Sequence, residues 1–221
     1  MPYSESHTYR LPVLSTGLSD VQQAEFNGKL ARWAFMEVRV RFRMLGVKSG
    51  NKVRRGDANS SWRWQHAAAR VLQVQNAIWQ NRQSPLLDFT PAMEHGAGNC
   101  GEMSGAVAQI VNRSGGYAEQ YCVDLVGSHA FALVGLPPQG ATDPVTLAGF
   151  DPCWAVDPWA GIVCPAIDYC VEFERKMHHW AALGKSIYYQ QQWVQAADPR
   201  WITAVTRGHK RVNIAYTGFV Y

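Results

Sequence analysis

The sequence predicts an α+β domain in which N-terminal helices pack against an antiparallel sheet. Apolar residues at helical spacing dominate the first part of the chain, from about Ser19 to Ser84. Shorter apolar segments typical of strands dominate the part after Tyr117. Two of these segments are joined only by Gly127-Ser128, and so short a connection requires antiparallel pairing. Helices followed by antiparallel strands indicate the α+β class.

The length of 221 residues suits one domain, or one domain with an appended helical region. We expect residues 1–90 to form a helical N-terminal region that packs on a core made by residues 91–221, so that the two parts form one compact unit. A composition that is 47% hydrophobic and 17% charged is ordinary for a globular protein.

Two long helices are predicted before residue 90. Ser19 and Gln22 have the spacing of a capping box, and the helix that they begin runs to about Leu45. A loop rich in glycine and basic residues separates it from a second helix, which begins near Ser61 and ends at Ser84. The apolar stripe of the first helix consists of Phe26, Leu30, Trp33, Ala34 and Val38.

A third helix begins at Cys100, where a glycine-rich lead-in meets helical periodicity that continues to about Arg113. Asn99 suits the N-cap position, and Glu102 stands where a capping box places an acid. A side chain on the first turn lies near unpaired backbone N–H groups and the positive end of the helix dipole. This environment favours the thiolate, which is the nucleophilic form of cysteine. The alternative is a small cysteine packed inertly at a helix end.

A thiolate nucleophile needs a base, and the base needs an orienting group. His129 opens an apolar strand, where it shares one face with Phe131 and Leu133. The segment Cys153–Asp157 predicts a short strand that ends in an Asp-Pro pair, which makes Asp157 the favoured acid. Asp151 also precedes a proline and is the alternative acid. Without a catalytic role, the histidine would be a packed strand residue and either aspartate a turn residue.

Five further segments complete the expected fold. Residues 168–183 predict a helix, and residues 187–194 are compatible with either a helix or a strand. Strands are expected at 145–150, 201–206 and 212–221.

Three short motifs occur in the order Cys, His, Asp: Asn99-Cys100-Gly101-Glu102, Ser128-His129-Ala130-Phe131 and Val156-Asp157-Pro158-Trp159. Their order and contexts resemble the papain-like and transglutaminase-like thiol enzymes. The resemblance is strongest to the papain-like domains of bacterial toxins and effectors, several of which deamidate host glutamine. It covers roughly residues 94 to 160.

The resemblance implies a papain-like Cys-His-Asp fold and a thiol-dependent amidase that deamidates a glutamine side chain of a protein substrate. A papain-like cysteine protease is the alternative activity. Papain-like proteases carry a glutamine shortly before the cysteine, and residues 94–99 contain none, so Asn99 or a backbone N–H would replace it. The implied catalytic residues are Cys100, His129 and Asp157, with Asn99, Gly101 and Glu102 supporting the oxyanion site.

No cofactor and no metal is expected. Five cysteines are an odd number, so at least one is unpaired within the chain, and Cys100 is the candidate. The remaining cysteines lack the C-x-x-C spacing of zinc sites and are interpreted as reduced core residues. They are Cys122, Cys153, Cys164 and Cys170.

No apolar run is long enough to span a membrane, and no charged-then-apolar leader opens the chain. We therefore expect a soluble protein without a signal peptide. The resemblance to effectors implies export by a specialised secretion route and action in the cytosol of a target cell. The expected partners are a protein substrate and an immunity or host target protein.

The net charge of +4 is unevenly spread along the chain. Residues 29–55 contain nine basic residues and only one acidic residue, Glu37. This region suits an acidic partner or an anionic membrane surface, although a solvated face is the commoner outcome. It lacks interleaved aromatic residues and any nucleic-acid motif, which argues against nucleic acid as a partner. If Cys100 is inert, the chain is instead a helical binding module that uses this region.

Overall fold

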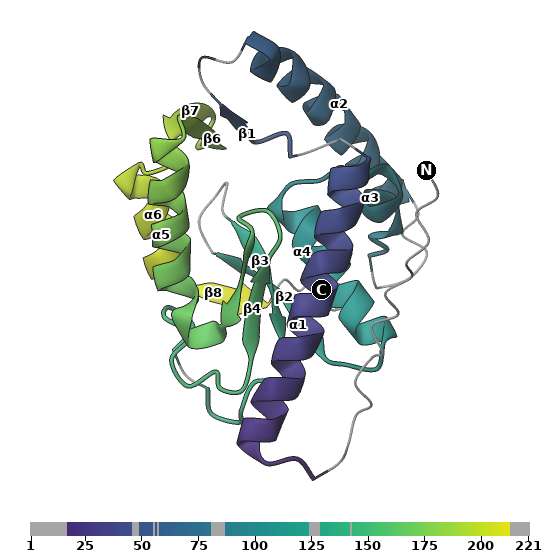
Figure 1. Ribbon diagram of the computed structural model, residues 1–221, viewed down its shortest axis with the longest axis vertical. Helices are drawn as coiled ribbons and strands as arrows, with labels where there is room; N and C mark the ends of the chain where they lie inside the picture. Colours follow the sequence, from purple (N-terminus) through teal and green to yellow (C-terminus); the bar gives the residue numbers. More distant parts are fainter. Residues whose placement is uncertain are drawn as a thin grey trace, which may run out of the picture.

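The computed structural model describes residues 17–45, 49–54, 56, 58–80, 87–123, 129–141 and 143–212. Helices and two antiparallel sheets confirm the α+β class (Figure 1). In chain order the elements are α1 (Asp20–Met44), β1 (Lys52–Arg54), α2 (Ala58–Gln80), α3 (Thr90–His95), α4 (Cys100–Arg113), β2 (Ala118–Val123), β3 (Ala130–Val134), β4 (Trp154–Asp157), β5 (Ile162–Pro165), the short 3-10 helix η1 (Ala166–Asp168), α5 (Tyr169–Ala182), β6 (Lys185–Tyr189), β7 (Gln192–Gln195), α6 (Pro199–Arg207) and β8 (Lys210–Val212).

The larger sheet has the order β5-β4-β3-β2-β8, and every neighbouring pair is antiparallel. Helices α1 and α4 lie on one side of it in Figure 1, and α5 and α6 lie on the other. The central strand β3 is buried along its whole length. Its Phe131 ring stacks on Tyr169 of α5, with centroids 4.3 Å apart. Because side chains alternate along a strand, the small Ala130 and Ala132 face the other side, where they let α4 approach closely.

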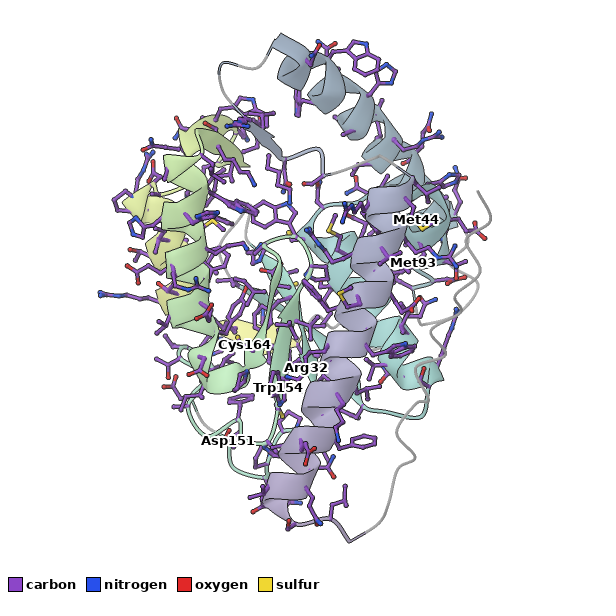
Figure 2. All side chains as sticks on the ribbon, viewed as in Figure 1. Arg32, Met44, Met93, Asp151, Trp154 and Cys164 are labelled. Atoms are coloured by element: carbon purple, nitrogen blue, oxygen red, sulfur yellow. The ribbon has the colours of Figure 1, made fainter. Side chains whose placement is uncertain are left out.

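Helix α1 begins as predicted, with the Ser19 side chain accepting from Gln22 and the Gln22 side chain accepting from the Ser19 N–H. It crosses β4 at Gly28, where an added Cβ would lie 2.6 Å from the Trp154 ring. Figure 2 shows Arg32 beside Trp154, and the guanidinium carbon lies 4.7 Å from the ring centroid. This crossing holds the strand that ends at Asp157 against the N-terminal helix.

The smaller sheet has the order β1-β6-β7 and joins distant parts of the chain. Its strand β1 lies in a segment that was expected to be a loop, because three residues provide too little periodicity to identify a strand. β1 pairs with β6, with Lys52 opposite Ile187. One hydrophobic core contains buried residues from both sides of residue 90.

The expectation of a strand at 201–206 was wrong, because this segment lies in α6. Asp198 caps the helix by accepting from the Arg200 N–H at 2.9 Å, and Pro199 occupies its first position. Trp201, Ile202 and Val205 are buried at helical spacing. The cap and the first-turn proline therefore outweigh the strand propensity of the segment.

The strand expected at 145–150 was also wrong, because the chain forms turns there. The Asp143 carboxylate accepts hydrogen bonds from the N–H groups of Val145 and Thr146 at 2.9 and 3.0 Å. Such local side-chain acceptors satisfy the backbone without a neighbouring strand. The ambiguous segment 187–194 forms β6 and β7, joined by Gln190 and Gln191 with positive φ.

Of the remaining predicted elements, some are confirmed and others lie outside the described residues. The helix at 168–183 and the strand ending at Asp157 are confirmed as α5 and β4. The Gly127-Ser128 turn, the end of the second helix at Ser84 and most of the strand at 212–221 lie outside the described residues. Within the described ranges, no helix has the length and apolar character to cross a membrane.

We expect Gly28→Ala to lower the free energy of unfolding by about 1–3 kcal/mol, because the new methyl group collides with the Trp154 ring. Gly101→Ala is the matched helical control, since a Cβ there meets nothing within 4 Å. That change should be neutral or stabilise by up to about 1 kcal/mol. Urea unfolding of both variants measures the difference, and equal stabilities would contradict this packing.

Candidate active site

Two strand ends bring His129 and Asp157 together. Strand β3 begins directly after His129, and β4 ends at Asp157. The two strands are antiparallel neighbours, with Ala132 opposite Val156, so the start of one lies beside the end of the other. His129 Nε2 lies 2.5 Å from Asp157 Oδ2. The two side chains are 1% and 0% exposed, so this is a fully buried pair.

The buried pair favours the charged imidazole. Burial by itself lowers the pKa of His129, but the Asp157 carboxylate raises it by more, and the Cys100 side chain adds to the rise. The pKa of His129 is thereby raised to about 10. An imidazolium held against a carboxylate at neutral pH is therefore the expected state of the pair.

Asp157 has two further donors. The Ala160 N–H donates to Oδ1 at 2.8 Å, and the Tyr169 hydroxyl donates to Oδ2 at 3.1 Å. Burial and the Asp157 charge raise the pKa of Tyr169 well above its usual value, so its hydroxyl remains a neutral donor. Asp157 thus accepts hydrogen bonds at both carboxylate oxygens, as a buried carboxylate requires.

Cys100 is the third residue of the arrangement, and its side chain interacts with the His129 ring. It is the first residue of α4, which packs on β2 and β3, and its side chain is partly exposed. His129 Nδ1 is buried and makes no full hydrogen bond within the described structure, yet the Cys100 side chain interacts with the same ring. Because Asp157 occupies Nε2, Nδ1 is the nitrogen left for the thiol. Contacts of this kind are often loosely aligned in an enzyme without substrate.

Aromatic rings from three elements surround the imidazole. The ring centroid of His129 lies 5.0 Å from that of Trp159, 5.2 Å from Phe173 and 5.8 Å from Trp201. They separate the His129–Asp157 pair from water. Trp159 belongs to the third sequence motif, but Phe173 of α5 and Trp201 of α6 carried no signal that linked them to the site.

The residues expected to support the oxyanion site have different positions. Glu102 accepts from the Asn99 N–H at 2.7 Å and from Gln75 Nε2 at 2.8 Å, which is the capping role. The Gly101 carbonyl accepts from the buried Gln120 at 2.6 Å. Gln120 was not predicted, although a lone glutamine in an apolar strand was a usable signal. Asn99 is half-buried beside the nucleophile, and its side chain faces residues 49–50.

Asp151 is not part of this arrangement. It is exposed in the turn before β4, below Trp154 in Figure 2, with a cis bond to Pro152. Of the two aspartates considered, Asp157 is the one that contacts His129.

All five cysteines are free thiols. Burial raises the pKa of both Cys153 and Cys164 to about 12, so these two thiols remain protonated at neutral pH. Among the residues that the structure describes, no group of His, Cys, Asp and Glu side chains is arranged to hold a metal ion.

Several basic residues of the 29–55 region donate hydrogen bonds to backbone carbonyl groups of the same chain. Arg39 donates to the Pro158 carbonyl at 3.1 Å, Lys52 to the Trp159 carbonyl at 2.6 Å and Arg54 to the Leu183 carbonyl at 3.1 Å. Arg41 and Arg43 are exposed, whereas Lys48 and Arg55 lie outside the described residues. Part of the predicted basic surface thus stabilises the loop that follows Asp157.

The raised pKa of His129 predicts a pH-dependent stability. An unfolded imidazole has a pKa near 6.5 and the folded one about 10, so between these values only the folded protein holds this proton. The contribution of this pair to the free energy of unfolding is therefore complete below pH 6.5, and it is lost as the pH rises toward 10. Urea unfolding from pH 6 to pH 10 should show a steeper loss for wild type than for Asp157→Asn. If the free energies of unfolding of both proteins changed with pH in the same way, His129 and Asp157 would not form a charged pair.

Comparisons of the chain with models of protein families, with curated proteins and with solved structures find no match, so its function has to be argued from the site itself.

Proposed function

We propose that this protein is a thiol-dependent amidase of the papain-like type that acts on a protein substrate. One observation carries the proposal: the buried imidazole of His129 is bonded to Asp157 at Nε2, and the Cys100 side chain interacts with the same ring. A nucleophile, a base and an orienting acid in this order are the requirements of acyl transfer by a thiol.

The proposed reaction has two stages. The Cys100 thiolate attacks the carboxamide carbon, and the His129 imidazolium gives its proton to the departing nitrogen, so that ammonia leaves and a thioester remains. His129 then takes a proton from water, which attacks the thioester and releases a carboxylic acid and the Cys100 thiolate, so that the thiolate and the imidazolium are restored. Asp157 holds the imidazole with Nδ1 toward the sulfur throughout both stages.

The negative oxygen of each tetrahedral intermediate needs two donors. The Cys100 N–H, at the start of α4, supplies the first. Asn99 is proposed as the second, because the residue is half-buried directly before the nucleophile. Gly101 leaves open space beside the thiol, since a Cβ there would meet nothing within 4 Å.

The substrate is inferred from the resemblance to bacterial toxin and effector domains. It favours a glutamine side chain of a host protein, reached after export by a specialised secretion route, over cleavage of a peptide bond. The two outcomes share the same chemistry at Cys100. They differ in the product, because deamidation leaves the target chain intact while proteolysis cuts it.

Incubation of target proteins with the enzyme, followed by intact-mass analysis and peptide mapping, tests the proposal. Wild type should convert a glutamine to glutamate, whereas Cys100→Ala should be inactive but folded, because alanine fits at a helix start. His129→Ala should lose roughly 10²- to 10⁴-fold in rate. Asp157→Asn should lose less than Cys100→Ala, since an orienting group supplies only part of the effect.

Asp151→Ala is the matched control, because this aspartate is exposed and the carboxylate bonded to His129 is that of Asp157. It should keep wild-type activity. Fragments in place of an intact, deamidated target would show the protease instead. Full biological effect of Cys100→Ala would overturn the enzyme proposal and favour the binding module.

Thiol reactivity provides a second prediction that needs no substrate. Cys100 should react with iodoacetamide at neutral pH faster than Cys153 and Cys164, whose thiols are buried and protonated. Peptide mapping after brief treatment measures each rate. His129→Ala should slow the reaction of Cys100 and leave that of the other two unchanged; equal rates at all three cysteines would contradict the nucleophile assignment.

A further inference from the structure

Residues 49–51 contact the nucleophile side of the site, although they belong to none of its sequence motifs. Asn99 Oδ1 accepts a hydrogen bond from Ser49 Oγ at 3.1 Å and another from the Gly50 N–H at 3.0 Å. Asn99 directly precedes Cys100. The segment therefore holds the side chain that stands next to the proposed nucleophile.

The same three residues contact the base side of the site. Trp159 Nε1 donates to Asn51 Oδ1 at 2.7 Å and to Ser49 Oγ at 2.8 Å, and Trp159 packs on His129 with ring centroids 5.0 Å apart. Ser49 and Trp159 are only 3% and 1% exposed. Trp64 of α2 anchors the segment from behind, because its Nε1 donates to the Gly50 carbonyl at 2.7 Å.

We propose that Ser49 and Asn51 are positioning residues for the reaction, which bridge the two sides of the site through Asn99 and Trp159. This inference rests on the proposed function. Neither residue touches the reacting atoms; each acts by holding a side chain that does so or that encloses the base.

The contacts to Asn99 determine which end of its amide is available. The Gly50 N–H donates to Oδ1 and turns the oxygen toward residues 49–50, and Ser49 Oγ, whose one hydrogen is shared between Asn51 Oδ1 and Asn99 Oδ1, lies on the same side, so Nδ2 is directed away from them. Nδ2 makes no hydrogen bond with any residue in the described ranges and keeps its N–H groups for a ligand. An amide with the opposite orientation would present an acceptor to the oxyanion and repel it.

The contacts to Trp159 keep water from the His129–Asp157 pair. The indole has two acceptors that fix its ring in place. If the ring moves, water reaches the pair and screens the attraction between carboxylate and imidazolium. When a smaller fraction of His129 is charged, the ring stabilises the Cys100 thiolate less. The thiol should then need a higher pH to react.

The pH dependence of Cys100 alkylation tests this inference without a substrate. Asn51→Ala removes one acceptor of Trp159 and should move the midpoint of the alkylation rate to higher pH by roughly 0.5–1 unit. Asn51→Gln keeps an amide oxygen as the acceptor without adding a charge and should restore the wild-type midpoint. Asn76→Ala, at an exposed position on α2, is the matched control and should change nothing.

Two further variants separate positioning from a general loss of structure. Trp159→Phe keeps a ring against His129 but lacks the N–H, so it should reproduce the shift of Asn51→Ala and carries the test if Asn51→Ala fails to fold. Ser49→Ala should lower kcat on a substrate more than it raises KM, because the Asn99 donor acts on the tetrahedral intermediate.

The outcomes distinguish this inference from the proposed function. If wild-type Cys100 shows no preferential alkylation, the proposed function itself fails. If wild-type Cys100 reacts as proposed but the midpoints of Asn51→Ala and Trp159→Phe equal that of wild type, only the positioning role is overturned. A shift in Asn51→Ala that Asn51→Gln does not reverse would also overturn it.

Discussion

The site depends on one interaction, the hydrogen-bonded pair of His129 and Asp157 in a fully buried place. Removing two ionisable groups from water costs several kcal/mol per ion unless their remaining polar atoms are satisfied. The Ala160 N–H and the Tyr169 hydroxyl provide part of that compensation at the carboxylate. The Cys100 side chain, which interacts with the same imidazole, adds to the stabilisation of its charged form. The cost of burial thus couples the stability of the pair to the reactivity of the thiol.

This requirement explains why both parts of the chain contribute to the site. Helix α1 supplies Arg39, which holds the Pro158 carbonyl directly after the acid; burial lowers the pKa of Arg39, and the Asp157 charge opposes that change. Helices α5 and α6 supply Phe173 and Trp201 as walls around the imidazole. Residues 49–51 connect Trp159, which also packs on the imidazole, to Asn99 at the start of α4. The N-terminal region therefore builds the enclosure of the pair as well as the core.

The sequence predicted the parts of the site whose signals are local. Asn99 and Glu102 mark the start of α4 within a few residues, and the ends of two antiparallel strands place His129 beside Asp157. The contact of Asn51 with Trp159 joins residues 108 positions apart, so no short pattern reveals it. Trp201 was assigned to a strand, whereas Asp198 caps a helix there, and its place against His129 was missed with it.

The central claim is that His129 is an imidazolium at neutral pH, held by Asp157 beside Cys100. Nitrogen NMR of selectively labelled histidine measures this directly, with His129 assigned by its loss in His129→Gln. Both ring nitrogens of His129 should remain protonated from pH 6 to pH 8.5, because its pKa is raised to about 10. Titration of His129 with a midpoint near its ordinary value of 6.5 would show that Asp157 does not hold an imidazolium at neutral pH.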